Sequence, residues 1–277
     1  MAPSEPVFAK PPPDTKHCLV LFPSLSILLV LINRPLALNS LSNEASNELD
    51  SVFRWFDREQ SLRVAVISGV GKAFCVGADL KEWMANNKKG VSMKLPENGF
   101  GGLSLRGGKK PVIAAVNGPA YGGGCEMAVN CDMVVASSTA TFGLPEVKRG
   151  VTPFAGALPR IMRTAGKQRA TELALTGRPV SAQEFKDWGL CNHVVEEGKC
   201  VVEKAIEYAK MIANNSPDAS IVTREGLKLG WEALGVVDAS RVFLEGWSNR
   251  IYDGPNMQEG LDAFTEKREP RWKDSKL

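Results

Sequence analysis

The sequence predicts an α/β fold that becomes mostly helical toward the C-terminus, and two observations lead to this prediction. Apolar runs alternate with segments of helical periodicity, an order typical of strands joined by crossover helices. After Gly150, helical segments dominate. We therefore expect an α/β core over residues 17–195 and a helical C-terminal region over 196–277. The apolar runs are 25–33, 62–70, 110–120 and 131–143.

The first helix is expected directly after the first apolar run. Ser42 is a suitable N-cap residue, and Leu49, Val52, Phe53 and Phe56 recur at helical spacing. The helices expected in the last part of the chain are 156–165, 167–175, 181–188, 200–215, 218–230, 237–250 and 256–267. Residues 86–108 contain several glycines and lysines and are expected to form a long loop, in the place where a lid would lie.

Composition excludes several classes of protein. The chain has 277 residues, 44% of them hydrophobic, which suits a globular fold with a sizeable core. A formal charge of +3 does not indicate a nucleic-acid or membrane partner. The six cysteines form no CxxC pair, and the two histidines do not stand at metal-ligand spacing. We therefore expect no metal site and reduced thiols.

The two ends of the chain carry separate predictions. Residues 1–16 are rich in proline, which predicts a disordered lead. The most apolar run, Leu25 to Ile32, is much shorter than the ~20 residues of a membrane helix. The final residues Ser275, Lys276 and Leu277 match a peroxisomal address that an import receptor reads. The polar segment before them predicts an exposed tail, and we expect a peroxisomal protein.

Two glycine-lined turns precede predicted helices. In "GKAFCVGADLKEW", Gly77 and Ala78 lead to Asp79, a good N-cap residue, and the helix begins near Leu80. In "NGPAYGGGCEMAV", the triple glycine around Gly123 stands directly before a helix. Amide N–H groups at a helix start have no partner within the helix. Two such donors that converge on one point form an oxyanion hole, although either turn alone could be only a tight connection.

Two glutamates follow these turns. Glu126 lies within one helical turn of the triple glycine, and Glu146 lies 20 residues later in "LPEVKRG". A pair of carboxyl groups can add water to a conjugated double bond, because one takes a proton from water and the other delivers one to carbon. On the residues alone, Glu126 could instead complement the helix dipole, and Glu146 could be a solvated charge.

The segments "GKAFCVGADLKE", "IAAVNGPAYGGGCEMAVNCDMVVAS" and "TFGLPEVKRG" resemble the crotonase family, the enoyl-CoA hydratase/isomerase superfamily. The likeness runs from about Ile27 to the C-terminus. It implies a spiral of ββα units with a helical C-terminal region, assembly as a homotrimer or a hexamer, and acyl-CoA thioester substrates. It implies no metal or redox cofactor, since coenzyme A is part of the substrate.

The resemblance also assigns roles to residues. It assigns the oxyanion-hole amides to Ala78 and Gly123. It assigns the transfer of the α-proton to Glu146, and the orientation or activation of the water to Glu126. Glutamates at both positions are typical of the hydratase branch. The substrate-binding positions it implies are Leu36, Ala37, Leu38, Asp79, Leu80, Phe264 and Lys267. A lysine is common in the family where Leu36 stands, and the helix with Phe264 and Lys267 sometimes reaches coenzyme A from a neighbouring subunit.

The expected reaction is the reversible hydration of a 2-enoyl-CoA. Phe154, in "GVTPFAGALPRI", adds bulk beside the acyl site, which favours a short, branched or hydroxylated acyl group over a long straight chain. Fungal relatives of this kind act in siderophore and secondary metabolism, and fatty-acid metabolism is the wider context. Two alternatives remain: a Δ3,Δ2-enoyl-CoA isomerase, which needs one base only, and a non-catalytic RNA-binding member of the superfamily. No strongly basic helix supports the second.

Overall fold

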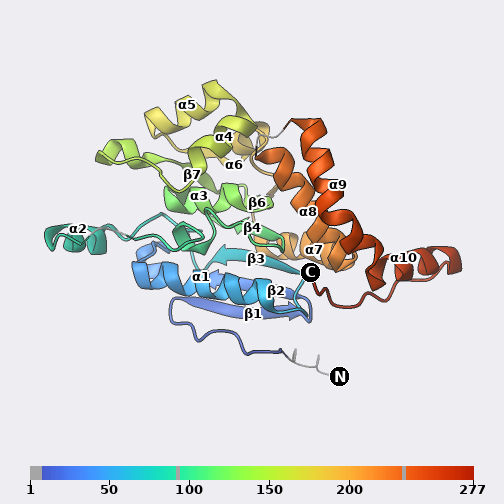
Figure 1. Ribbon diagram of the computed structural model, residues 1–277. Coiled ribbons are helices and arrows are strands. Elements are labelled where there is room, and N and C mark those ends of the chain that lie inside the picture. Colours follow the sequence, from blue (N-terminus) through green and yellow to red (C-terminus); the bar gives the residue numbers. More distant parts are fainter. Residues whose placement is uncertain (1–7, 92–93, 233–234) are drawn as a thin grey trace.

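The computed structural model describes residues 8–91, 94–232 and 235–277 (Figure 1). Its main sheet lies in the middle of the molecule, with strands β1, β2, β3, β4, β6 and β9 as neighbours in that order. β1 pairs antiparallel with β2, and every other neighbouring pair is parallel. The strands are β1 (Cys18–Ser24), β2 (Ile27–Ile32), β3 (Val64–Gly69), β4 (Val112–Val116), β6 (Met133–Ser137) and β9 (His193–Val195).

A second, smaller sheet gives the fold its repeated ββα units. β5 (Ala120–Tyr121) pairs with β7 (Thr141–Gly143), and β7 pairs with β8 (Val180–Ser181). β4 and β6 therefore each supply a strand to the main sheet before the next strand joins the small one. The expected α/β fold with a spiral of ββα units is confirmed in this arrangement. β2, β3, β4, β6 and β7 lie within the predicted apolar runs, β5 exceeds its run by one residue, and β1, β8 and β9 lie outside them.

The main sheet is buried on both faces, which is why its strands read as nearly continuous apolar runs. One face packs against α7 (Val201–Ala213) through residues such as Val66, Ile113 and Ala205. The other face packs against α1 (Asn43–Arg58) and the small sheet. As predicted, the side chain of Ser42 caps α1 by accepting a hydrogen bond from the amide of Ala45, 3.2 Å away.

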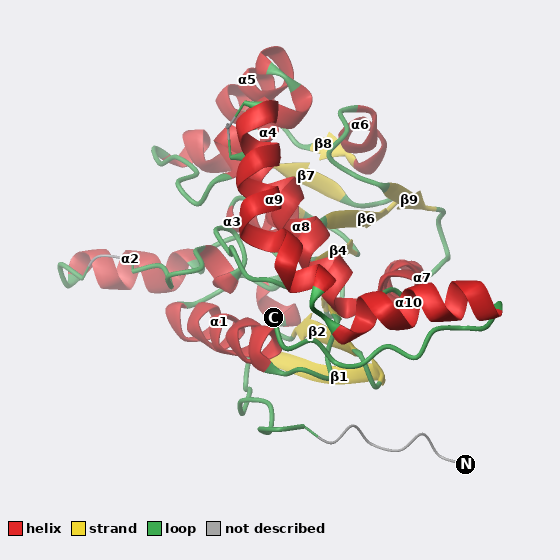
Figure 2. Cartoon of the chain, turned by 45° about the vertical axis from the view of Figure 1, so that its right-hand side comes forward, coloured by secondary structure: helices red, strands yellow, loops and turns green. Residues whose placement is uncertain are grey.

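The helices after residue 150 begin and end within about two residues of their predicted bounds. They cover the top and one side of the sheet, and α8, α9 and α10 extend on the side opposite α2 (Figures 1 and 2). None of the described helices is long and apolar enough to cross a membrane. The remaining helices are α2 (Leu80–Lys88), α3 (Gly123–Asn130), α4 (Ala157–Ala165), α5 (Lys167–Thr176), α6 (Ala182–Asp187), α8 (Pro217–Trp231), α9 (Val236–Tyr252) and α10 (Pro255–Glu266).

The segments at the two ends differ from the sequence-based expectation. Residues 1–7 of the expected lead lie outside the described residues, but 8–16 pack against α1: Phe8 contacts the Trp55 ring edge-on, with centroids 5.2 Å apart, and the Trp55 indole donates to the carbonyl of Lys10. The aromatic side chains provide the burial that the proline-rich composition does not suggest. The tail was expected to be exposed, and this is true of Lys276, but Leu277 is half-buried, Ser275 is buried and Lys109 contacts the carbonyl of Leu277.

The expected loop over 86–108 is only partly a loop. α2 extends to Lys88, and residues 92–93 lie outside the described part. The second half turns at Phe100–Gly102 and is buried against α1 and α3, with the amide of Gly101 donating to Ser46. Through these contacts with distant residues, this half becomes part of the core. In contrast, α2 projects from the body of the molecule, and every residue in it is at least partly exposed (Figure 1).

Candidate active site

The first glycine-lined turn is held in place by strand-like pairing with Leu41, through the residues directly before and after Ala78. Gly77 accepts a hydrogen bond from the amide of Leu41, and the amide of Asp79 donates to the carbonyl of Leu41. Ala78, between them, donates its own amide to no acceptor in the described part of the chain. The turn therefore presents one unused N–H group, as predicted from the sequence.

Asp79 fixes how this turn enters α2. Its carboxylate accepts from the amides of Lys81 and Glu82 and lies 2.9 Å from the guanidinium of Arg34. Partial burial acts to raise the pKa of this carboxyl, but the hydrogen bond from Arg34 and the two amides hold the pKa below its ordinary value. Asp79 thus caps the helix and braces Ala78, and its carboxylate is occupied by these partners.

The second turn has a backbone that needs glycine. Gly122 has φ of 53°, and its amide donates to the carbonyl of Gly143, 2.9 Å away. A Cβ atom on Gly124 would overlap the carbonyl of Cys75, so the helix start packs directly on the first turn. Gly123 is the first residue of α3, and its amide therefore has no partner within the helix.

The two turns face each other across a short gap. A Cβ atom on Gly77 would lie 3.4 Å from the amide nitrogen of Gly123, which shows how closely the two backbones approach. Both Ala78 and Gly123 line one cavity of about 1110 Å³. Two amides that have no acceptor among the described residues therefore lie in the wall of a single cavity, as an oxyanion hole would require.

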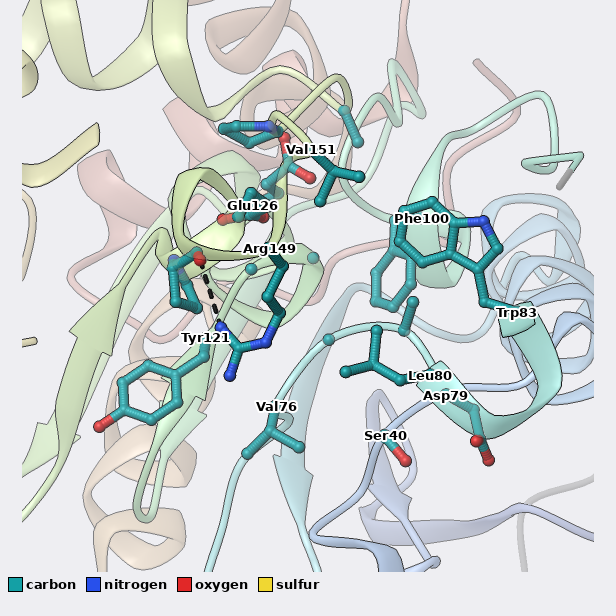
Figure 3. A pocket seen from close by; sticks show the side chains of 18 of the residues that line it. Ser40, Val76, Asp79, Leu80, Trp83, Phe100, Tyr121, Glu126, Arg149 and Val151 are labelled. Carbon is teal, nitrogen blue, oxygen red and sulfur yellow. Dashed lines mark hydrogen bonds between the residues drawn. The ribbon is translucent and has the colours of Figure 1, made fainter. Parts of the chain in front are cut away.

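The cavity brings together most of the residues predicted from the sequence. Its lining includes Glu126 and Glu146, and Figure 3 shows Glu126 across the cavity from Phe100 and Trp83. The predicted substrate-binding residues in the lining are Leu36, Ala37, Leu38, Asp79 and Leu80. Phe154 also lines it, at the rim, where its side chain is 84% exposed.

Phe264 and Lys267 are not brought to this cavity. Phe264 lies on α10 and Lys267 directly after it, on the opposite side of the molecule from α2 (Figures 1 and 2). Phe264 is 86% exposed. Within this chain the assignment of these residues to the substrate site is therefore not supported by their position, because α10 folds onto α9 and the last residues rather than back over the cavity.

Glu126 is a buried carboxyl group on the first turn of α3. Its side chain accepts a hydrogen bond from the amide of Ala157, 3.3 Å away, at the start of α4. Burial raises its pKa from an ordinary 4.5 to about 7; the Ala157 amide opposes this shift, and the negative charge of Glu146 adds to it. A carboxyl that titrates near neutral pH can act as a base or as an acid.

Glu146 comes from the short 3₁₀ turn Pro145–Arg149, just after β7. Its Oε1 would lie 3.0 Å from a Cβ on Gly122, so the carboxyl sits against the backbone of the second turn. Oε2 is buried and has no hydrogen-bond partner in the part of the chain that the structure describes. Burial raises the pKa of this carboxyl too. An unpartnered buried oxygen is costly unless a ligand meets it, which is expected of a group that faces substrate.

Other lining residues were missed by sequence reasoning. Phe100 and Tyr121 lie in the cavity wall, and a Cβ on Gly123 would overlap the Phe100 ring. Phe100 comes from the segment expected to be a loop, so no periodic pattern marked it. Tyr121 stands next to the triple glycine, and that position was the available signal.

Comparison with known proteins agrees with this geometry. The family model described as enoyl-CoA hydratase/isomerase matches residues 24–275. The chain is 49% identical over 265 residues to a mevalonyl-coenzyme A hydratase of Aspergillus fumigatus (96% of this chain, 98% of the relative) and 48% identical over 280 residues to one of Beauveria bassiana (98% and 99%).

Among solved structures, an enoyl-CoA hydratase from Mycobacterium tuberculosis superposes with a TM-score of 0.86 at 32% identity, over 94% of this chain and 99% of that one. The predictions of a crotonase-type fold and of an enoyl-CoA hydratase are confirmed by these matches. The family match spans nearly the whole chain and includes both turns and both glutamates, and this chain therefore belongs to the enoyl-CoA hydratase/isomerase family.

Proposed function

We propose that this enzyme adds water reversibly across the C2=C3 bond of a short, branched 2-enoyl-CoA, or removes it from the corresponding 3-hydroxyacyl-CoA. The observation that carries the proposal is the shared cavity: the buried Glu126 and the half-buried Glu146, both with raised pKa values, line it together with two backbone amides that have no acceptor among the described residues. An isomerase needs the amides and one base, whereas hydration also needs a group that handles water.

In the hydration direction, the ionised Glu126 accepts a proton from water as the water oxygen bonds to C3. The electrons of the double bond move toward the thioester, and the amides of Ala78 and Gly123 hold the resulting enolate oxygen. Protonated Glu146 then delivers its proton to C2. Burial raises the pKa of both groups, so each holds a proton more readily than a solvated carboxyl. The division of roles between them follows the family resemblance. The protein residues suffice for each step, so we propose that no metal or redox cofactor takes part.

The acyl group we propose resembles the mevalonyl group, a branched chain with hydroxyl substituents. The support is that the two relatives near 49% identity are mevalonyl-coenzyme A hydratases. A role in siderophore biosynthesis would follow from this substrate.

A substrate panel tests the proposal. Crotonyl-CoA, a long-chain 2-enoyl-CoA and mevalonyl-CoA are assayed side by side, with product identification and with a chelator in a parallel series. We expect the highest kcat/KM for the branched hydroxylated substrate and no loss on chelation. Preferred turnover of the long chain would contradict the proposed acyl group, and absence of any hydration or dehydration would contradict the reaction.

We also propose assembly as a homotrimer or a dimer of trimers. Support comes from large apolar side chains on α8, α9 and α10 that remain exposed in the single chain, among them Val236 (83%) and Phe264 (86%). Clusters of this kind usually mark an interface. Light scattering after size exclusion would show three or six times the mass of the chain, and a monomer would contradict the proposal.

Peroxisomal import likewise stays a proposal, supported by the Ser275–Lys276–Leu277 sequence. Because Ser275 is buried, an import receptor would have to draw the tail away from the body. A fluorescent fusion at the N-terminus should be peroxisomal and should become diffuse when Leu277 is deleted; a deletion variant that stays in peroxisomes would refute it.

A further inference from the structure

Arg160 is a half-buried cation one turn into α4, outside the residues that line the cavity. Long side chains on a helix point back toward its N-terminus, and Arg160 does so: a Cβ on Gly156 would overlap its guanidinium. Gly156 also has φ of 101°. Glycine therefore suits this position, because it leaves room for the guanidinium and tolerates a positive φ. The guanidinium therefore lies across the start of α4.

The same guanidinium also reaches the segment 100–104, whose first residue, Phe100, lines the cavity. Its Nη1 donates to the carbonyl of Ser104, 2.9 Å away. The hydroxyl of Ser104, a fully buried residue, accepts from the amide of Phe100 at 2.7 Å. Phe100 in turn packs against Gly123 of the second turn. Arg160 thus connects α4 to the segment that supports one of the oxyanion-hole amides.

The start of α4 is also what holds Glu126. The amide of Ala157 donates to the Glu126 carboxylate, and α4 packs against α3, which carries Glu126. Burial is the largest influence on the pKa of this carboxyl and raises it, whereas the positive charge of Arg160 is a smaller influence that favours the ionised form. The other charged group that acts on Glu126 is Glu146, which opposes ionisation, while Arg160 itself also interacts with Glu232 and Arg163.

We propose that Arg160 is a positioning residue of this active site: it clamps the α4 N-terminus to the 100–104 segment, and its charge keeps the Glu126 carboxyl ready to accept a proton from water. The inference rests on the proposed hydration reaction. Its chemical consequence is specific, since a clamp without charge would hold the geometry but would leave Glu126 harder to ionise.

The test compares Arg160→Met, Arg160→Gln and Arg160→Lys with the control Arg163→Met. Arg163 lies on the same helix, is exposed, and donates to the carbonyl of Trp231 away from the cavity. The measurements are kcat and kcat/KM for hydration from pH 5 to 9, with circular dichroism and thermal melting to verify folding.

Removal of the cation raises the pKa of Glu126, so the acidic limb of the kcat/KM profile should move to higher pH in the Met and Gln variants. We expect kcat to fall by about 10-fold to 100-fold, because a small misplacement of a catalytic group is costly, with KM little changed. The Lys variant keeps the charge and should keep the limb near its wild-type position, with reduced kcat. Arg163→Met should match wild type.

The double variant Glu126→Gln, Arg160→Gln separates charge from structure. Because Glu126→Gln is itself expected to abolish hydration, the double variant is compared with Glu126→Gln by the pH dependence of its free energy of unfolding. Without the Glu126 carboxyl, loss of the Arg160 charge should not shift that dependence, whereas Arg160→Gln alone should shift it to higher pH. If a folded Arg160→Gln enzyme retains the wild-type acidic limb and kcat, or if the double variant still shows the shift, the inference is overturned. If Arg160→Met does not fold, the Gln and Lys variants decide the question. Absence of hydration in wild type would instead refute the proposed function, so the two failures are distinguishable.

Discussion

Replacement of Glu126 by glutamine should make the protein more stable at neutral and alkaline pH. Burial raises the pKa of this carboxyl from 4.5 to about 7 in the folded protein. One pKa unit corresponds to about 1.4 kcal/mol, so the folded state disfavours the ionised form by about 3 kcal/mol. Because the folded state binds more protons than the unfolded state between these two values, the free energy of unfolding falls as pH rises from about 4.5 to about 7 and is level above.

Glutamine has the same shape and still accepts the hydrogen bond from Ala157, but it does not ionise. The stability difference between Glu126→Gln and wild type should therefore increase by about 2.5 kcal/mol between pH 5 and pH 8. Urea denaturation followed by circular dichroism measures this difference, at one protein concentration because the proposed assembly would add to apparent stability.

The matched control is Glu197→Gln, a substitution on the exposed loop after β9. It should give the same difference from wild type at both pH values. If the stability difference between Glu126→Gln and wild type is also independent of pH, the reasoning is refuted. The Glu126 carboxyl would then not be destabilised by its burial.

Three further substitutions test the site. Glu146→Gln should lower kcat by about 10²–10⁴ while acyl-CoA still binds by calorimetry; normal turnover would remove Glu146 from the mechanism. Ala78→Pro deletes one amide donor and should lower kcat by about 10²–10³, whereas Ala78→Ser should not, and equal rates for the two would exclude an oxyanion role for this amide. Gly124→Ala forces a Cβ onto the Cys75 carbonyl and should destabilise by about 1–3 kcal/mol, whereas Gly230→Ala, open on α8, should stabilise; similar melting temperatures would contradict the packing argument.

Sequence reasoning succeeded where structure is determined by neighbouring residues. Ser42 and Asp79 cap their helices through atoms two or three residues away, so the capping pattern in the sequence is sufficient to place both helix starts. The apolar runs located the parallel strands because both faces of the sheet are buried. β1 was missed although residues 18–22 are all apolar, because this short run lies between the proline-rich start of the chain and Pro23.

Sequence reasoning failed where the position of a segment depends on residues that are distant in the chain. The segment around Phe100 has the glycines of a loop, yet Gly102 lies against the backbone of Asp50, and burial follows from that contact. The clamp by Arg160 joins residues 56 positions apart and has no local signature. The oxyanion amides proposed at Ala78 and Gly123 were predicted from family resemblance together with glycine-lined turns, and the cavity that both residues line only became visible in three dimensions.

The most direct measurement of the central claim is the mass of the product that the wild-type enzyme forms from a branched 2-enoyl-CoA, followed together with loss of the conjugated thioester absorbance. Two carboxyl groups and two free amides around one cavity predict a 3-hydroxyacyl-CoA, heavier than the substrate by one water, and this product should disappear in both Glu126→Gln and Glu146→Gln. A product of unchanged mass with a shifted double bond, or undiminished hydration in both variants, would contradict the account.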